Sequence, residues 1–106
     1  MDKCPEAITD EVLQRTAHIP DSEVEQDIVD TETEIAGLAY LAEGYRLIAE
    51  ANAGNPEGKM AAFRQSAAEI GAKERGEFVQ FLRRLQQARQ ARRLAGPECC
   101  GMADHA

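Results

Sequence analysis

Glu74 is the strongest candidate in this sequence for a chemical role, because it interrupts a run of apolar positions. At about 100° of helix per residue, it falls in the middle of a stripe made of Met60, Phe63, Ala67, Ile70, Phe78, Phe81, Leu85 and Ala88. An ionised carboxylate among apolar side chains costs several kcal/mol unless a cation, a metal or hydrogen bonds compensate it. The sequence therefore predicts either that Glu74 is buried with something bound to it, or that the helix bends away at this point.

Two further acids belong with Glu74. Glu77 lies one turn later on the border of the same stripe, and Glu34 lies on the preceding helical segment. A chain reversal near residue 54 would set position 34 roughly level with position 75, so the three carboxylates converge, and a two-fold partner doubles them to six. Carboxylate-rich sites inside four-helix bundles hold iron or manganese. Glu34, Glu74 and Glu77 are the predicted metal ligands.

The alternative hypothesis for Glu74 is structural. It can pair with Lys73, with Arg75 or with an arginine of a partner chain. A polar residue in a helical core often fixes the register or the oligomeric state instead of doing chemistry. Both hypotheses stay open at this point.

The first long helix that positions these acids is predicted from about residue 21 to Asn52. Ser22 and Glu25 have the spacing of a capping box, which indicates a helix start. Apolar or small residues then recur in alternating steps of four and three, at positions 24, 28, 31, 35, 38, 42, 45 and 49. Leu41 and Ile48 widen this stripe on one flank. Glycines and a proline interrupt the pattern after Asn52.

A second long helix is predicted to begin at Asn55 and Pro56, a cap followed by proline at the first helical position. It ends near Leu94, where Gly96 and Pro97 follow. The expected fold is all-α: an antiparallel helical hairpin with a short N-terminal helix, assembling as a four-helix bundle dimer or larger. The predicted ranges are a lead-in at 1–20 with a helical patch from Glu6 to Ala17, the hairpin at 21–95 and a tail at 96–106.

Composition agrees with helices. Of the 106 residues, 43% are hydrophobic, only 5% are aromatic and tryptophan is absent, so the side chains that sheets favour are few. The net charge of −7 argues against binding nucleic acid through its phosphates. The chain shows no apolar run long enough for a membrane span and no signal-peptide pattern, which predicts a cytoplasmic protein without a membrane partner.

Charge is distributed unevenly along the chain. Residues 1–35 hold eleven acidic and two basic side chains, whereas a later stretch is cationic through Arg83, Arg84, Arg89, Arg92 and Arg93. A reversal near residue 54 sets the acidic stretch beside the arginines. The expected outcome is mutual pairing of the helix ends. The other hypothesis is an acidic partner or a nucleic acid bound by the arginines.

The segment from Glu74 to Phe81, ERGEFVQF, resembles the Glu-x-x-His-x-x-x-Phe element of rubrerythrin and ferritin-like di-iron proteins, with Glu77 at the histidine position. The two-helix format over residues 22–90 also resembles the encapsulated ferritins, whose iron site forms across a dimer of hairpins. The resemblance implies Fe(II) oxidation or iron storage, a possible di-iron centre held by Glu34, Glu74 and Glu77, and an encapsulin shell or another protein as partner.

The ends of the chain carry a second set of potential ligands. The C-terminal segment contains Cys99, Cys100, Met102 and His105, and the N-terminal lead-in contains Cys4. Thiols, thioethers and imidazoles are soft ligands for Cu(I) or zinc. Adjacent cysteines chelate a single ion poorly, so the pattern predicts no metal here. Two alternative functions remain: a thiol-based metal chaperone or redox sensor, and a non-enzymatic helical-hairpin adaptor or assembly subunit without metal.

Overall fold

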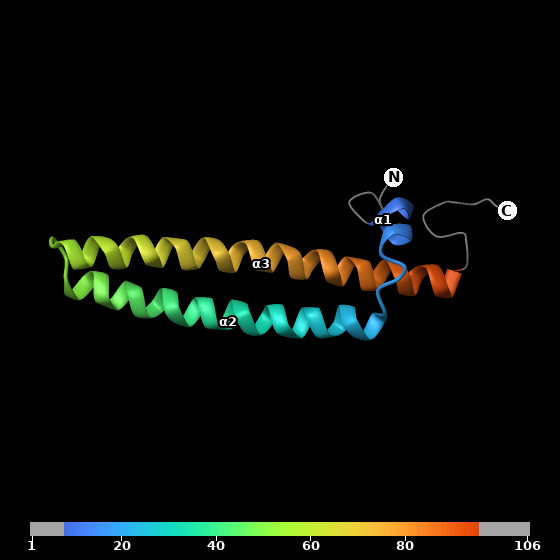
Figure 1. The fold of residues 1–106 in the computed structure, drawn as a ribbon, viewed down its shortest axis with the longest axis horizontal. Helices are drawn as coiled ribbons and strands as arrows, with labels where there is room; N and C mark the ends of the chain where they lie inside the picture. Colours follow the sequence, from blue (N-terminus) through green and yellow to red (C-terminus); the bar gives the residue numbers. More distant parts are fainter. Residues whose placement is uncertain (1–7, 96–106) are drawn as a thin grey trace. The chain divides into compact units, whose positions relative to one another are not determined.

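The computed structural model describes residues 8–95, and Figure 1 shows that they form three α-helices. These are α1 (Asp10–Arg15), α2 (Asp21–Ala51) and α3 (Pro56–Ala95), with no strand in the described part. The all-α prediction is confirmed, and so are the two long helices that pack together. Cys4 and the cysteine-containing tail lie outside the described residues.

The chain divides into two packing units. One contains the residues up to Ile28 together with those from Gln80 onward, and the other runs from Val29 to Val79. Each unit contains part of α2 and part of α3, and α1 belongs to the first unit.

Helix α1 is shorter than the predicted patch. Thr9 is its N-cap, and the Thr9 side chain accepts a hydrogen bond from the backbone N–H of Val12 at 3.2 Å. Such a cap fixes where a helix begins, because it satisfies a backbone N–H that has no partner inside the helix. The helix ends at Arg15, where the Thr16 hydroxyl donates to the carbonyl of Val12 at 2.8 Å.

The start of α2 depends on Pro20 rather than on the predicted capping box. The backbone N–H groups of Glu23 and Val24 donate to the Pro20 carbonyl at 3.0 and 3.1 Å. The helix therefore begins at Asp21, and Ser22 lies inside it. The Glu25 carboxylate accepts a hydrogen bond from Gln86 at 2.8 Å instead of reaching back to the helix start.

The turn between the long helices has the predicted form. Helix α2 ends at Ala51, and the chain passes through Gly54, whose φ of 91° suits a residue without a side chain. The Asn55 side chain then accepts from the backbone N–H of Gly58 at 3.1 Å, with Pro56 at the first position of α3. Asn55 and Pro56 are thus confirmed as the start signal of the second long helix.

The contact between α2 and α3 in the unit from Val29 to Val79 is built from small side chains. Ala42, Ala61 and Ala68 are buried, together with Thr31 and Val79. On α3 the buried and half-buried positions Ala61, Gln65, Ala68 and Ala72 follow alternating steps of four and three residues, as in coiled coils, and buried Val79 lies seven residues after Ala72. We call these positions, with the predicted stripe of α2, the seam. Alanines in a seam allow close approach but bury little apolar area.

The largest buried side chains belong to the other unit. Val24, Ile28 and Leu85 are 1%, 2% and 1% exposed, and Leu82 is also buried. Val24 and Ile28 open the apolar stripe predicted for α2. This stripe is confirmed along its length, since each of its positions is buried or half-buried.

Candidate functional site

Glu74 is exposed in the single chain, which corrects the prediction that it is buried. The stripe predicted for the inner side of α3 lies mainly outside: Met60 is 49% exposed, Phe63 70%, Ile70 57% and Phe78 46%. The seam of α3 uses the positions one residue later, about 100° further round the helix. The physical reason is that α2 packs against the alanines, where the backbones approach closely.

Glu34 and Arg75 form an ion pair between α2 and α3. The Arg75 Nε lies 2.9 Å from Oε1 of Glu34, and Arg75 also donates to the carbonyl of Gly71 at 3.2 Å. The prediction that position 34 lies roughly level with position 75 along the hairpin is therefore confirmed. Arg75, which the sequence offered as a partner for Glu74, pairs with Glu34 instead.

The three predicted ligands do not gather in one chain. Glu34 is engaged by Arg75, while Glu74 and Glu77 are exposed on α3. Within residues 8–95 no group of three or more histidine, cysteine, aspartate or glutamate side chains is close enough to hold a metal ion. Within the described residues of one hairpin, Glu34, Glu74 and Glu77 thus do not form a shared metal site.

An exposed apolar surface lies on one side of the unit from Val29 to Val79. On α2, Leu41 and Ile48 directly precede the seam positions Ala42 and Ala49; on α3, Met60 and Phe78 directly precede Ala61 and Val79. Because the helices are antiparallel and face each other, positions that precede the seam lie on the same side of the pair. All four preceding side chains are between 46% and 49% exposed. We call Leu41, Ile48, Met60, Ala67 and Phe78 the outer face.

The opposite side of this unit carries a shallow groove that includes charged side chains. The groove of about 330 Å³ is lined by Ala39, Ala42, Glu43, Arg46, Gln65, Glu69 and Ala72. Arg46 pairs with Glu43 and with Glu50, the latter at 2.7 Å, and Gln65 donates to Glu69 at 2.9 Å. The hydrogen bond from Arg46 holds the pKa of Glu43 below its usual range. The charged groups of the groove thus satisfy one another.

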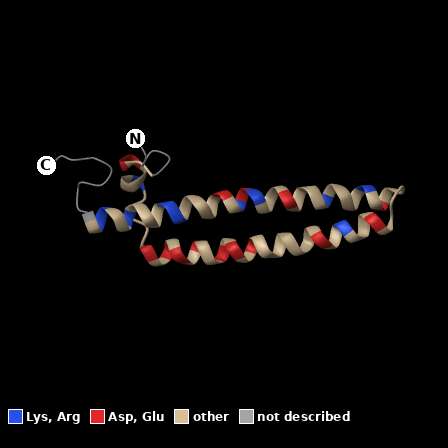
Figure 2. Cartoon of the chain, turned by 180° about the vertical axis from the view of Figure 1, so that it is seen from behind, with Lys and Arg blue, Asp and Glu red and all other residues tan. Residues whose placement is uncertain are grey.

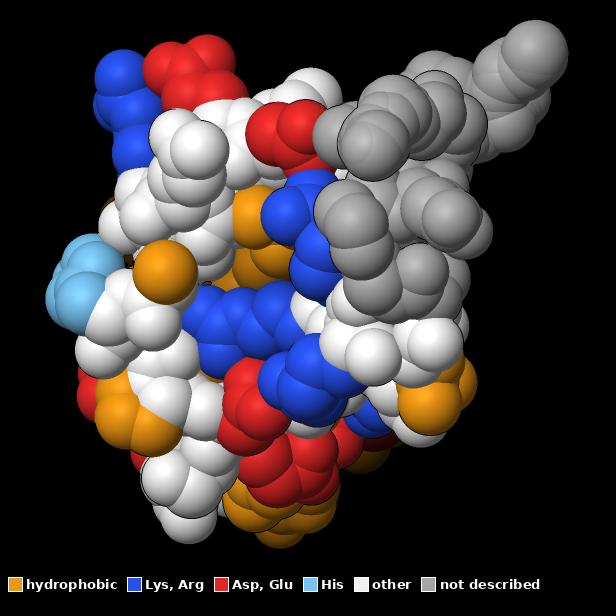
Figure 3. Space-filling view, turned by 90° about the vertical axis from the view of Figure 1, so that its right-hand side faces the viewer, with side chains coloured by type: hydrophobic (Ala, Val, Ile, Leu, Met, Phe, Trp, Pro, Cys, Tyr) orange, Lys and Arg blue, Asp and Glu red, His pale blue; other side chains and the backbone are white. Residues whose placement is uncertain are grey.

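The arginines at the end of α3 pair with acids of α1 and α2, as predicted. Figure 2 shows acidic residues along the first part of α2 and basic residues on the last part of α3, and Figure 3 shows basic side chains next to acidic ones on the surface of this unit. Arg92 pairs with Asp10, and Arg93 lies 3.1 Å from Asp21. The prediction of mutual pairing between helix ends is therefore confirmed.

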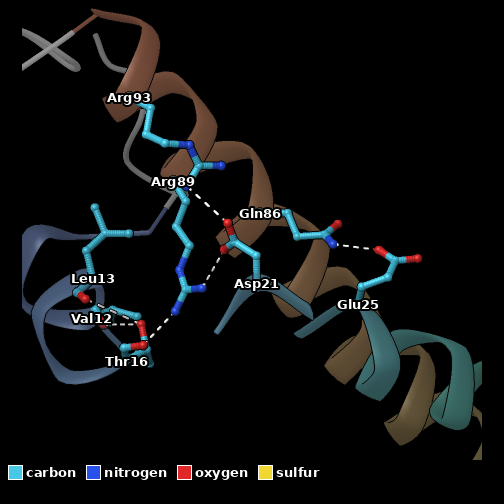
Figure 4. A network of polar contacts seen from close by, with 8 residues as sticks. All are labelled: Val12, Leu13, Thr16, Asp21, Glu25, Gln86, Arg89 and Arg93. Carbon is cyan, nitrogen blue, oxygen red and sulfur yellow. Dashed lines mark hydrogen bonds and ion pairs between the residues drawn. The ribbon is translucent and has the colours of Figure 1, made fainter. Parts of the chain in front are cut away.

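Arg89 is the most enclosed member of this cluster. Its side chain is only 11% exposed, and it donates to Oδ1 of Asp21 at 2.7 Å and to the backbone carbonyl of Thr16 at 2.6 Å (Figure 4). One guanidinium thus ties the end of α1 and the start of α2 to α3. Sequence reasoning treated Arg89 as one of five equivalent arginines. The missed signal is its position seven residues after Leu82, which continues the seam spacing.

The pairing makes acid sensitivity a testable property of Asp21. Its hydrogen bond to Arg89 is the main cause of a pKa below the usual value, and Arg93 lowers the pKa further. A carboxyl with a lowered folded-state pKa stabilises the fold above the unfolded-state pKa of about 3.9, and this contribution is lost as the pH falls through the folded-state value. We expect the urea midpoint of the wild type to fall more steeply below about pH 4 than that of Asp21→Asn. Glu23→Gln, an exposed acid outside the cluster, serves as the control and should keep the wild-type slope.

No family model matches the chain, and no curated protein or solved structure shows significant similarity to it. Among the described helices, none contains an apolar stretch long enough to cross a bilayer.

Proposed function

We propose that the protein is a self-associating helical hairpin, an assembly subunit that forms a homodimer or larger oligomer through the outer face. The observation that carries the proposal is the reversed distribution of side chains on α3. Its alanines fill the seam, whereas Met60 and Phe78 of the outer face are about half exposed. Exposed apolar side chains gathered on one side of a protein mark protein–protein contact sites.

Burial energetics support a second copy on the outer face. Full burial of a large apolar side chain contributes roughly 1.5–3 kcal/mol, and Leu41, Ile48, Met60 and Phe78 each remain about half exposed. Two antiparallel helices joined by a short turn bury only one seam, and pairing of two such hairpins gives a four-helix bundle. The area that the alanine seam does not bury is then recovered between copies.

The experiment is size-exclusion chromatography with light scattering on the full chain. We expect the wild type to be a dimer or larger, and Ile48→Gln with Met60→Gln to shift it toward monomer. The control variant carries Tyr40→Gln and Leu47→Gln, which remove exposed apolar side chains of α2, 81% and 53% exposed, that lie outside the outer face, and it should keep the wild-type mass. A monomeric wild type, or equal effects of both variants, contradicts the proposal.

Iron binding is the second candidate function. It is favoured by the position of Glu74 between Ile70 and Phe78 on the exposed side of α3, where a covering hairpin would enclose the carboxylate. The resemblance to encapsulated ferritins also favours it. Glu74, Glu77 and Glu34 are the proposed ligands, with a second hairpin contributing its own carboxylates. A cytoplasmic location and an encapsulin partner stay predictions.

Metal content tests this candidate directly. Protein equilibrated with Fe(II) and then desalted is expected to retain iron, measured by elemental analysis, and Glu74→Gln should lose it without a change in helical content. Glu69→Gln, an acid that lines the groove, should retain the wild-type amount. Iron-free wild type, or equal iron in both variants, removes the candidate and leaves the assembly function standing.

A further inference from the structure

We infer that two copies pair α3 against α3 in antiparallel orientation, across a two-fold axis between Ala67 and Gly71, so that Glu74 meets Arg64 of the partner subunit. This inference deepens the proposed self-association and rests on it. It assigns a register, an orientation and a charged contact to the outer face.

The positions of α3 that precede the seam form a continuous coiled-coil stripe. They follow alternating steps of four and three residues: Met60, Arg64, Ala67, Gly71, Glu74 and Phe78. Gly71 is half-buried and the others are exposed. A stripe offset by one residue from the seam lies about 100° from it, close to the right angle at which a helix in a four-helix bundle meets its second neighbour.

This stripe is self-complementary when it is read in the opposite direction. Met60 pairs with Phe78, Arg64 with Glu74 and Ala67 with Gly71, and the three pairs share one midpoint. A two-fold interface sets each residue against its counterpart reflected through that midpoint. Apolar groups then meet apolar groups, opposite charges meet, and small residues lie beside the axis, where they permit close approach.

The charge of Glu74 selects the antiparallel arrangement. Arg75, its sequence neighbour, is held by Glu34 at 2.9 Å, so once a second copy covers Glu74, the compensating cation is either Lys73 or an arginine of that copy. In the antiparallel arrangement Arg64 of the partner subunit supplies it. A parallel arrangement in register would set Glu74 against Glu74 of the partner subunit, and like charges across an interface are strongly unfavourable.

Helix α2 agrees with the same axis. The contact between Arg75 and Glu34 fixes the level of the two helices, and the midpoint of the α3 stripe then corresponds to the turn of α2 that contains Leu41. Leu41 belongs to the outer face, and Gly37 and Gly44, which also precede seam positions, flank it one turn away on either side. The axis thus sets Leu41 beside Leu41 of the partner subunit, with glycines on both sides.

Charge reversal tests the contact. We expect Arg64→Glu alone, and Glu74→Arg alone, to raise the dimer dissociation constant in sedimentation equilibrium about a hundredfold, because each creates two symmetric like-charge contacts. The double variant with Arg64→Glu and Glu74→Arg should return to within about threefold of the wild type. Circular dichroism checks that the helices are retained in each variant.

Cross-linking tests the register independently. In a chain whose three native cysteines are replaced by serine, Leu41→Cys should form a disulfide-linked dimer on mild oxidation, whereas Leu47→Cys, on another side of α2, should not. A dimeric wild type with no rescue in the double variant, or with equal cross-linking at both positions, overturns this register and leaves self-association intact. A monomeric wild type overturns both.

Discussion

Leu85→Ala is expected to lower the free energy of unfolding by about 2–5 kcal/mol. Leu85 is 1% exposed and packs in the unit whose other large buried side chains are Val24 and Ile28. Truncation removes apolar contacts and leaves a cavity that rigid helices fill only in part. Since small domains have about 5–15 kcal/mol of total stability, the loss is a large fraction of it.

Urea denaturation at one fixed protein concentration measures this effect, because stability that is coupled to oligomerisation depends on concentration. Leu94→Ala is the matched control: Leu94 lies on the same helix but is 80% exposed, and its truncation should change stability by less than about 0.5 kcal/mol. Comparable losses in the two variants would show that Leu85 does not belong to the core.

Gly58→Ala is expected to destabilise the turn between the long helices. A Cβ at position 58 would lie 2.2 Å from the backbone oxygen of Asn52, far inside van der Waals contact, and backbone atoms cannot swing away as a side chain can. Overpacking of this kind costs about 1–3 kcal/mol, which exceeds the gain of about 1 kcal/mol that alanine brings to a helix. The expected result is a lower urea midpoint.

Gly76→Ala provides the opposite expectation. Gly76 lies within α3, outside the proposed contact between copies, and a Cβ there would meet nothing within 4 Å. Alanine should therefore raise stability by about 0.5–1 kcal/mol through helix propensity alone. If both substitutions stabilise the protein, the close approach of the chain at Gly58 is not a constraint in solution.

The helices, the turn and the level of the hairpin could be predicted from the sequence because local signals determine them. Asn55 and Pro56 set the start of α3. The turn before them reverses the chain, so that Glu34 lies level with Arg75. The capping box at Ser22 failed for a local reason as well: the Pro20 carbonyl accepts the first helical hydrogen bonds, two residues before the expected cap. Two start signals competed there, and residue types alone do not rank their strength.

The inner side of α3 could not be predicted from side-chain size. Phe63 and Ile70 outweigh Ala61 and Ala68 on any hydrophobicity scale, yet the alanines form the seam. A helix with two apolar stripes can bury either one against its own chain, and the other stays available for a partner. The burial of Glu74 was predicted from the stripe that stays exposed. Its carboxylate therefore needs a compensating group only where a second hairpin covers this stripe.

The alanine seam leaves α2 and α3 with shallow ridges between them, and shallow ridges offer little resistance when one helix slides along the other. In the unit from Val29 to Val79, the length of the turn from Asn52 to Asn55 therefore sets which residues of α2 lie level with which residues of α3. Inserting or deleting one turn residue would shift Glu34 away from Arg75 and carry Leu41 out of line with Ala67. The two halves of the outer face would no longer form one surface.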